Sequence, residues 1–369
     1  MKSVYYFTNI FPKYRKSLWK LLIEEDQYDF NIYYSVGDLN GIKSESNTKS
    51  KKLHILKNYF INSRLIWQSK VIGVVCSKKI DLAIFMGEMN VISTWIAVFI
   101  CKLRNIEICF WGHGIYGNES KIKKFFRLLF LSLADRLLLY EKRAKKILIE
   151  GGFHKEKLEI IYNSLYYDHQ KKLFHKLESE NSSGLPYFKN DYPILLYVGR
   201  LTKQKKLEIL IKSIYELVKS NFKVNLLIIG NGDQEFYLKS LIKKLKINNV
   251  YFYGAEYDEE KLSGLIYNSD LCVSPGNIGL TAMHALSYGT PVASHDNFNN
   301  QMPEVESIIE GKNGFLFREG DPLDLARKIK SFLKVKLDKK KVSKIINEKY
   351  NPHYQKKIFD KLIFDGTNN

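Results

Sequence analysis

The chain has 369 residues, long enough for two ordinary domains, and its 45% hydrophobic and 26% charged residues are typical of a folded protein, not of a disordered one. Its formal charge is +19, and residues 1–190 hold most of the excess, with 31 Lys and Arg against 18 Asp and Glu. The strongly apolar run Met89–Cys101 is shorter than the roughly 18–20 residues that span a bilayer, and the N-terminus does not resemble a signal peptide. We therefore expect a cytoplasmic protein that touches a membrane only peripherally.

Short apolar runs alternate with longer amphipathic segments along the whole chain, which predicts parallel strands joined by helices. Helices are expected over residues 207–220 and 235–245, among others. The fold class is therefore α/β, with two doubly wound sheets whose ligands bind at the carboxyl ends of the strands. The expected strands are Ser3–Thr8, Phe30–Ser35, Asp81–Met86, Ile106–Trp111, Asp135–Tyr140, Leu158–Tyr162, Pro193–Gly199, Lys223–Gly230, Val250–Gly254, Asp270–Ser274 and Thr290–Ser294.

These strands fall into two groups, which predicts a first domain over residues 1–165 and a second over residues 193–345. The intervening residues 166–192 contain the polar stretch ESENSSGLP and are expected to form a linker. Residues 346–369 are expected to form a helix that packs back toward the first domain.

In the first domain, the segment IEICFWGHGIYG (residues 106–117) is the candidate site. A strand that ends at Gly112 would place His113 in the cleft facing the second domain. A histidine between two glycines is equally typical of an exposed loop.

The second domain begins with YVGRLTKQKKLEILI, in which a strand ends at Gly199 and Arg200 and Lys205 follow before an amphipathic helix. Two cations beside the N–H groups of a helix start suit a diphosphate. A solvated, lysine-rich turn is the alternative, because four of the seven residues 200–206 are basic. Asn231, between two glycines at the end of the next strand, is a weaker candidate for the same site.

The segment DLCVSPGNIGLTAMHALSYGTPV (residues 270–292) reads as a strand, a Pro-Gly loop and a helix. Its glycines permit close backbone approach, and the N–H groups at the positive end of the helix attract an anion. His284 lies one helical turn, ~5.4 Å, further along, where it can hydrogen-bond ribose hydroxyls or, alternatively, face the core. The residues expected around the anion are Gly276, Asn277, Gly279, Leu280 and Thr281.

Carboxylates follow the next expected strand. Asp296 stands at its end, and Glu304 and Glu306 precede a predicted helix. Such carboxylates either accept hydrogen bonds from sugar hydroxyls or cap helices.

Together these segments resemble the GT-B glycosyltransferases of family 4, retaining enzymes that use nucleotide-sugar donors. The resemblance covers most of the chain and is strongest over residues 193–330. It implies the GT-B fold, two Rossmann-like domains facing a central cleft. VGRLTKQKK is similar to the family segment whose arginine and later lysine hold the donor diphosphate, which implies that role for Arg200 and Lys205. His113 occupies the place of the family's cleft histidine.

One departure from the family stands in the loop and helix at 274–292. The family has two glutamates separated by seven residues, the first facing the transferred sugar and the second the ribose. Here Gly276 and His284 hold these positions. We infer that His284 takes over the ribose contact, and that Asp296, Glu304 or Glu306 supplies the missing carboxylate unless a different donor needs none.

The resemblance also implies the chemistry. The chain has no Asp-x-Asp motif, so we expect no metal and no cofactor, with Arg200, Lys205 and helix N–H groups neutralising the leaving diphosphate. The expected donor is a UDP- or GDP-sugar and the acceptor a saccharide or lipid-linked saccharide of bacterial surface-polysaccharide or glycolipid synthesis. Lys13 and Arg15, in the family's acceptor loop, suggest an acceptor with phosphate or an anionic membrane surface.

Two other functions remain open at this point. A GT-B nucleotide-sugar epimerase would convert the donor without an acceptor, and a non-catalytic sugar-nucleotide-binding subunit would bind donor without turnover. Nucleic-acid binding is suggested only by charge, and no recognition motif supports it.

Overall fold

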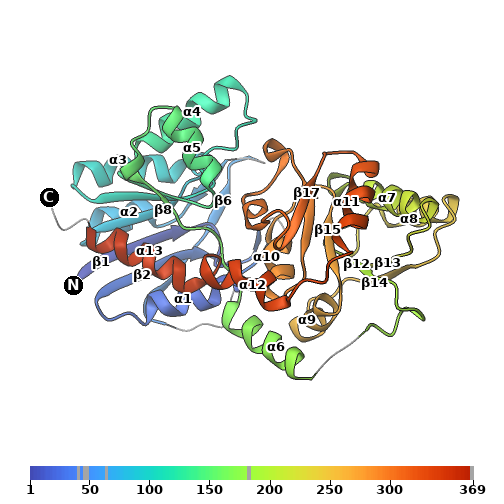
Figure 1. Ribbon diagram of the computed structural model, residues 1–369. Coiled ribbons are helices and arrows are strands. Elements are labelled where there is room, and N and C mark those ends of the chain that lie inside the picture. The colour runs from blue at the N-terminus through green and yellow to red at the C-terminus, as the bar shows by residue number, and fades with distance from the viewer. Residues whose placement is uncertain (40–41, 45–49, 63–64, 181–183, 366–369) are drawn as a thin grey trace. The chain divides into compact units, whose positions relative to one another are not determined.

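The computed structural model describes residues 1–39, 42–44, 50–62, 65–180 and 184–365 (Figure 1). The chain divides into two compact units. The first contains Met1–Tyr166 together with Asn351–Asn369, and the second contains Tyr167–Tyr350. The chain therefore leaves the first unit once and returns to it at the end.

The first unit is built on a seven-stranded sheet in the order β11-β10-β9-β8-β1-β2-β5, and all its neighbouring strands are parallel. The buried middle of each central strand is a continuous apolar run, as in Val4–Phe7, Leu82–Phe85 and Ile108–Trp111, because both faces of a parallel sheet are covered. The strands of this sheet are β1 (Lys2–Thr8), β2 (Tyr28–Ser35), β5 (Leu53–Leu56), β8 (Leu82–Met86), β9 (Glu107–Gly112), β10 (Arg136–Leu139) and β11 (Leu158–Ile160). Two short antiparallel pairs lie outside it, β3 (Asp38–Leu39) with β4 (Ile42–Lys43) and β6 (Asn58–Phe60) with β7 (Ile66–Gln68).

Helices bury both faces of this first sheet (Figure 1). One face is covered by α2 (Val71–Ser77), α3 (Ile92–Leu103), α4 (Lys121–Ser132) and α5 (Lys142–Glu150). The other face is covered by α1 (Lys16–Ile23), which follows the 3-10 turn η1 (Lys13–Arg15), and by the last helix, α13 (Pro352–Asp365). In α13, the Phe359 ring packs edge-on against the rings of Phe30 and Trp111.

The second unit is built on a six-stranded sheet in the order β14-β13-β12-β15-β16-β17, again with parallel neighbours. Strand order reverses between β12 and β15, and in doubly wound sheets ligands bind at the carboxyl ends of the strands at such a switch point. The strands are β12 (Ile194–Val198), β13 (Asn225–Ile229), β14 (Val250–Gly254), β15 (Leu271–Ser274), β16 (Val292–His295) and β17 (Gly314–Phe317).

One face of the second sheet packs on α7 (Leu207–Lys219), α8 (Glu235–Lys244) and α11 (Pro322–Phe332). The helix that leads out of the switch point is α10 (Leu280–Ser287), and it contacts α6, α12 and the 3-10 helix η5. The remaining elements of this unit are α6 (Tyr167–Ser179), α9 (Glu259–Tyr267), α12 (Lys339–Glu348), η3 (Lys203–Lys205), η4 (Phe298–Asn300) and η5 (Pro303–Ser307).

The expected α/β class with two Rossmann-like domains is confirmed, and every expected strand is present with its ends shifted by a few residues at most. The sequence does not predict β5 and β17, because LHIL and GFLF are four-residue strands without a long apolar run. Among the described residues, no helix is both long and apolar enough to cross a membrane.

The segment expected to be a linker contains a helix instead. Residues 167–179 form α6, which buries Leu173, Phe174 and Leu177 and belongs to the second unit. The expectation was wrong there because apolar residues spaced three and four apart outweigh the polar residues around them. Of the expected linker, residues 181–183 lie outside the described part of the chain, as do residues 366–369 of the expected C-terminal helix.

Candidate functional site

The candidate site of the second unit lies at the switch point of its sheet. Gly199 and Arg200 follow β12, and the loop 275–279 follows β15 and leads into α10. The two segments singled out from the sequence therefore meet, because β12 and β15 are neighbours. The fold alone accounts for this meeting of a basic turn with the start of a helix.

Lys205, in the turn η3, is fixed to the loop that precedes α10. Its Nζ donates to the backbone oxygen of Asn277 at 2.8 Å and to the Oδ1 of the same residue at 2.9 Å. Burial lowers the pKa of Lys205, and the positive charge of Arg200 lowers it further. Arg200 itself is exposed, and its backbone oxygen accepts a hydrogen bond from the Tyr197 hydroxyl at 2.9 Å. Two cations are thus held near each other, an arrangement that a bound anion stabilises.

Gly276 is required by the contact between this turn and the loop. A Cβ at position 276 would lie 2.5 Å from the Gln204 backbone oxygen and 2.8 Å from the Lys205 Cα. The group that approaches Gly276 closely is therefore the chain's own backbone. From the sequence, a bound ligand was expected in that place. The same contact leaves no room for a glutamate side chain at this position.

The start of α10 is more open. Gly279 is its N-cap residue, no side chain caps the helix there, and a Cβ on Gly279 would have nothing nearer than 3.8 Å. The loop before it is fixed by Gln301, whose Oε1 accepts from the Ile278 N–H at 2.8 Å. Leu280 and Thr281 are half-buried, and the Thr281 hydroxyl donates to the Val198 backbone oxygen at the end of β12 at 3.4 Å.

Of the three carboxylates proposed from the sequence, Glu304 lies nearest the helix start. Its Oε2 is 3.9 Å from the position of a Cβ on Gly279, and the side chain is buried in η5. Asp296 is exposed and its Oδ1 accepts from the Glu319 N–H at 3.2 Å, while Glu306 is half-buried.

His284 has a partner that the sequence did not suggest. Its Nε2 lies 2.9 Å from Glu259 Oε1, and the same oxygen accepts from Tyr288 Oη at 2.6 Å and Gln170 Nε2 at 3.0 Å. Burial would raise the pKa of Glu259, but the charge and hydrogen bond of His284, with the other two hydrogen bonds, outweigh it and hold the pKa at about 2. Only one ring nitrogen of His284 is therefore left for the ribose contact expected from the sequence.

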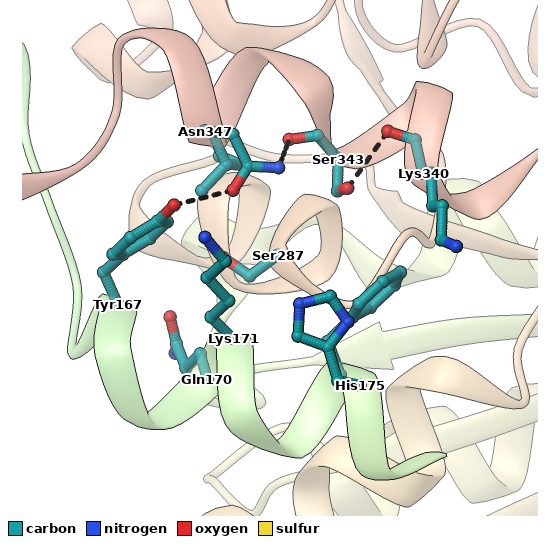
Figure 2. A pocket seen from close by; sticks show the side chains of 10 residues that line it. Tyr167, Gln170, Lys171, His175, Ser287, Lys340, Ser343 and Asn347 are labelled. Atoms are coloured by element: carbon teal, nitrogen blue, oxygen red, sulfur yellow. Dashed lines mark hydrogen bonds between the residues drawn. The ribbon is translucent and has the colours of Figure 1, made fainter. Parts of the chain in front are cut away.

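Gln170 connects this cluster to a small cavity of about 230 Å³ (Figure 2). α6, α10 and α12 supply its walls, and the Tyr167 hydroxyl donates to Asn347 Oδ1 across it at 2.8 Å. None of the site residues expected from the sequence lines this cavity.

The Gly-Asn-Gly turn after β13 has a structural explanation. A Cβ at Gly230 or Gly232 would collide with the backbone of Gly199 or Leu201 in the loop after β12, and the Leu201 N–H donates to the Asn231 backbone oxygen at 2.8 Å. The turn therefore shapes the loop that carries Arg200, and the Asn231 side chain stays exposed.

In the first unit, His113 lies at the carboxyl end of β9 in an open pocket of about 1100 Å³. Burial, together with the positive charges of Arg15 and Arg127, lowers the pKa of His113 to about 4. Its Nδ1 is buried and has no hydrogen-bond partner within the described residues. Glu88 lines the same pocket, and burial raises its pKa. The pocket thus presents a neutral imidazole to a ligand.

Arg15 is not the exposed cation that the sequence suggested. Its guanidinium is buried, donates to Tyr140 Oη at 2.7 Å and Asn163 Oδ1 at 3.2 Å, and lies 4.4 Å above the Trp111 ring. The aromatic residues at the carboxyl ends of neighbouring strands draw it inward, because a guanidinium stacks well on aromatic faces. Lys13 in the same turn is exposed.

Comparison with known proteins agrees with this geometry. Residues 180–351 match the family described as glycosyl transferases group 1. An uncharacterized glycosyltransferase of Methanocaldococcus jannaschii is 26% identical over 316 residues, which cover 77% of this chain and 76% of that protein. The chain is a glycosyltransferase of GT-B type, and its residues 180–351 carry the group 1 match.

Two solved structures have the fold of this glycosyltransferase over nearly its whole length. The lipopolysaccharide outer core galactosyltransferase WaaB superimposes with a TM-score of 0.71 at 18% identity, covering 99% of this chain and 100% of that one. Anabaena HepE, solved in complex with UDP, gives a TM-score of 0.68 at 16% identity, covering 98% and 99%. At these identities the likeness concerns the fold.

The sequence missed Glu259 as a partner of His284 in this glycosyltransferase. Glu259 follows Asp258, whose side chain caps α9, and acidic residues are common at the start of a helix because they stabilise its positive end. Nothing local in the sequence points to this pair, because Glu259 and His284 belong to different helices, 25 positions apart.

Proposed function

We propose that this glycosyltransferase transfers a sugar, with retention of anomeric configuration and without a metal ion, from a nucleoside-diphosphate donor to a saccharide or lipid-linked saccharide. The observation that carries the proposal is Lys205, held by Asn277 beside Arg200 at the switch point where α10 begins. A diphosphate there would meet two cations and the positive end of a helix.

The proposed chemistry uses this charge on the leaving group. Breaking the bond between the anomeric carbon and the phosphate oxygen leaves an additional negative charge on the nucleoside diphosphate. Arg200, Lys205 and the N–H groups at Gly279–Thr281 stabilise that charge, and preorganised donors of this kind typically contribute about 3–4 kcal/mol each to the transition state. In front-face attack, the departing phosphate oxygen takes the proton of the acceptor hydroxyl, so no separate base is needed.

Glu304 is the carboxylate that we assign to the transferred sugar. It is buried next to Gly279, whereas a glutamate cannot fit at Gly276. A carboxylate in this position accepts hydrogen bonds from sugar hydroxyls without opposing the diphosphate directly.

For the other substrates, the relatives give the first choices to test. HepE was solved with UDP, which favours a uridine nucleotide over a guanosine one, and WaaB is a lipopolysaccharide galactosyltransferase, which favours an acceptor in bacterial surface-polysaccharide or glycolipid synthesis. We place this synthesis in the cytoplasm, at the inner face of the cell membrane, because the first half of the chain is strongly basic.

The test begins with thermal shifts in UDP and GDP, followed by UDP- or GDP-sugars with candidate acceptors in the presence of a metal chelator. We expect stabilisation by one nucleotide, and a glycosylated product, of retained configuration, that forms equally well with the chelator. Conversion of the donor without an acceptor would identify an epimerase. Donor binding without transfer or hydrolysis would identify a binding subunit.

A further inference from the structure

Helix α4 of the first unit exposes apolar side chains where a soluble helix normally exposes polar ones. Ile122 is 75% exposed and Phe125 63% exposed, and Phe126 and Leu129 are also exposed. These four positions are spaced three and four apart, so they form one continuous stripe along the helix.

The opposite side of α4 accounts for its fold. Phe130 and Leu131 are buried in the core against the first sheet, and Arg127 is buried and pairs with Glu119 at 3.2 Å. The exposed stripe is therefore not needed to attach the helix to its own unit. A continuous row of four exposed apolar side chains on a protein surface marks an interaction site.

The charges of α4 indicate what covers this stripe. Lys121, Lys123 and Lys124 are exposed and flank it, and the sequence of α4 contains no acidic residue. A short helix with an apolar face flanked by lysines is typical of helices that lie in the interface of an anionic membrane, where the apolar side chains enter the acyl boundary and the lysines remain at the headgroups.

Helix α3 continues the same kind of surface. It touches α4 through the rings of Trp95 and Phe130, whose centroids are 4.8 Å apart. It too carries exposed apolar residues, Phe99 and Leu103, and its sequence contains no acidic residue. Figure 1 shows both helices on the same side of the first sheet.

We propose that the exposed face of α4, with its neighbour α3, docks on an anionic phospholipid surface. This deepens the proposed function, on whose membrane placement it rests, by naming the helix that makes the contact. It differs from the contact suggested by the sequence, since Arg15 is buried. Lys123, Phe126 and Arg127 of α4 also line the pocket that holds His113, so a lipid-linked acceptor in the membrane would meet that pocket at its rim.

Co-sedimentation with vesicles tests this inference. The probes are vesicles of phosphatidylcholine alone and of phosphatidylcholine with phosphatidylglycerol. The full chain is expected to bind the second kind, and the lysine pair Lys121→Glu/Lys124→Glu should weaken that binding by roughly tenfold or more, since each lysine near such a surface contributes about fivefold. The matched control is Lys243→Glu/Lys244→Glu, two exposed lysines on α8.

The apolar stripe is tested separately by added tryptophans, whose emission is read as the difference from the unaltered chain because that chain has four tryptophans of its own. Phe125→Trp should give a blue-shifted emission change with phosphatidylglycerol vesicles, whereas Phe236→Trp, at an 84% exposed position on α8, should not. Unchanged sedimentation of the α4 lysine variant, or no spectral response of Phe125→Trp, would overturn the inference. So would a dimer in solution in which α4 is protected, because a second copy would then cover the stripe.

This experiment separates the inference from the proposed transfer reaction. Vesicle binding without any transfer would support the membrane contact while contradicting the enzyme activity. Transfer without any vesicle binding would support the enzyme activity while contradicting the membrane contact.

Discussion

Lys205 is the residue on which the proposed chemistry depends most. Its Nζ is fixed by both oxygens of Asn277, so its charge is already in place before a substrate arrives. We predict that Lys205→Ala lowers kcat for transfer by about 10²–10³-fold, and that Arg200→Ala has a similar effect, as found for preorganised donors elsewhere.

The control for this prediction is Lys203→Ala, an exposed lysine of the same turn. Steady-state kinetics with a fixed acceptor provide the measurement. Equal activity of the Lys203 and Lys205 variants would mean that the turn is only a solvated basic segment.

The second prediction for a single residue concerns Glu304. Glu304→Gln keeps the size of the side chain but removes its charge, and we expect kcat/KM for the donor to fall by roughly 10–100-fold through weaker hydrogen bonds to the sugar. Asp296→Asn, at an exposed position turned toward Glu319, should leave that ratio almost unchanged. The reverse result would assign the carboxylate role to Asp296.

The lowered pKa of His113 predicts that the stability of the protein depends on pH. Its folded pKa is about 4, below the ordinary value near 6.5, so between these values the unfolded chain binds a proton that the folded chain does not. Stability is therefore full above about pH 6.5 and declines as the pH falls toward 4, by about 2 kcal/mol at pH 5 for this residue. His113→Gln should show a smaller drop in apparent Tm between pH 7 and pH 5.

The matched variant for this measurement is His154→Gln, at an exposed position of the same unit. It should keep the full pH dependence. If both variants behave like the unaltered chain, His113 is not held neutral by its surroundings.

At the scale of elements, the loop before α10 and the turn η3 form one packed structure. Gly276→Ala would place a methyl group within 3 Å of the backbone of Gln204 and Lys205, so we predict a loss of about 1–3 kcal/mol in stability together with loss of nucleotide binding. Thermal unfolding with and without UDP checks both effects. Gly279→Ala, whose Cβ would have nothing nearer than 3.8 Å, should unfold at nearly the temperature of the unaltered chain.

The elements also show what could be predicted from the sequence. The strand ends and the turn after β12 were located correctly because apolar runs and the polar residues that end them are local signals, whereas the roles of Arg200 and Lys205 stay predictions. The packing of Gln204 on Gly276 and the pairing of Glu259 with His284 were missed because they join residues 72 and 25 positions apart. Only the order of strands in the sheet brings such residues together.

The exposed apolar residues of α3 and α4 were missed for a related reason. The sequence KIKKFFRLLFLS has apolar residues on more than one side of the helix, so it does not show which of them are buried. An apolar stripe is normally assigned to the core. The structure shows that Phe130 and Leu131 already supply the core contact while Phe125 stays outside. Charge composition indicated a basic first half, but not which helix presents it.

At the scale of the molecule, the last helix completes the first unit. α13 buries Phe359, Leu362 and Ile363 against a face of the first sheet. Burial of such side chains contributes roughly 1.5–3 kcal/mol each, so removing all three costs about 5–9 kcal/mol, comparable to the whole stability of a typical domain. We predict that a chain ending at Tyr350 has an unfolded first unit.

Calorimetry and limited proteolysis of that truncated chain provide the check. The second unit should keep its unfolding transition, while the first should lose its own and be digested. A chain ending at Asp365 is the control and should retain both. A protected first unit in the shorter chain would show that α1 alone covers that face of the sheet.

The return of α13 also sets an order of events during synthesis. The strands of the first sheet and α1 leave the ribosome early, but α13, which completes the cover of the face that α1 packs on, emerges only after the whole second unit. Until then Trp111 and Phe30 lack their edge-on partner, and an apolar surface is open to other nascent chains. We therefore expect the first unit to complete its fold after the second, the reverse of the usual order in which the N-terminal domain folds first, and the yield in a cell to depend on the chaperones that shield the nascent first unit.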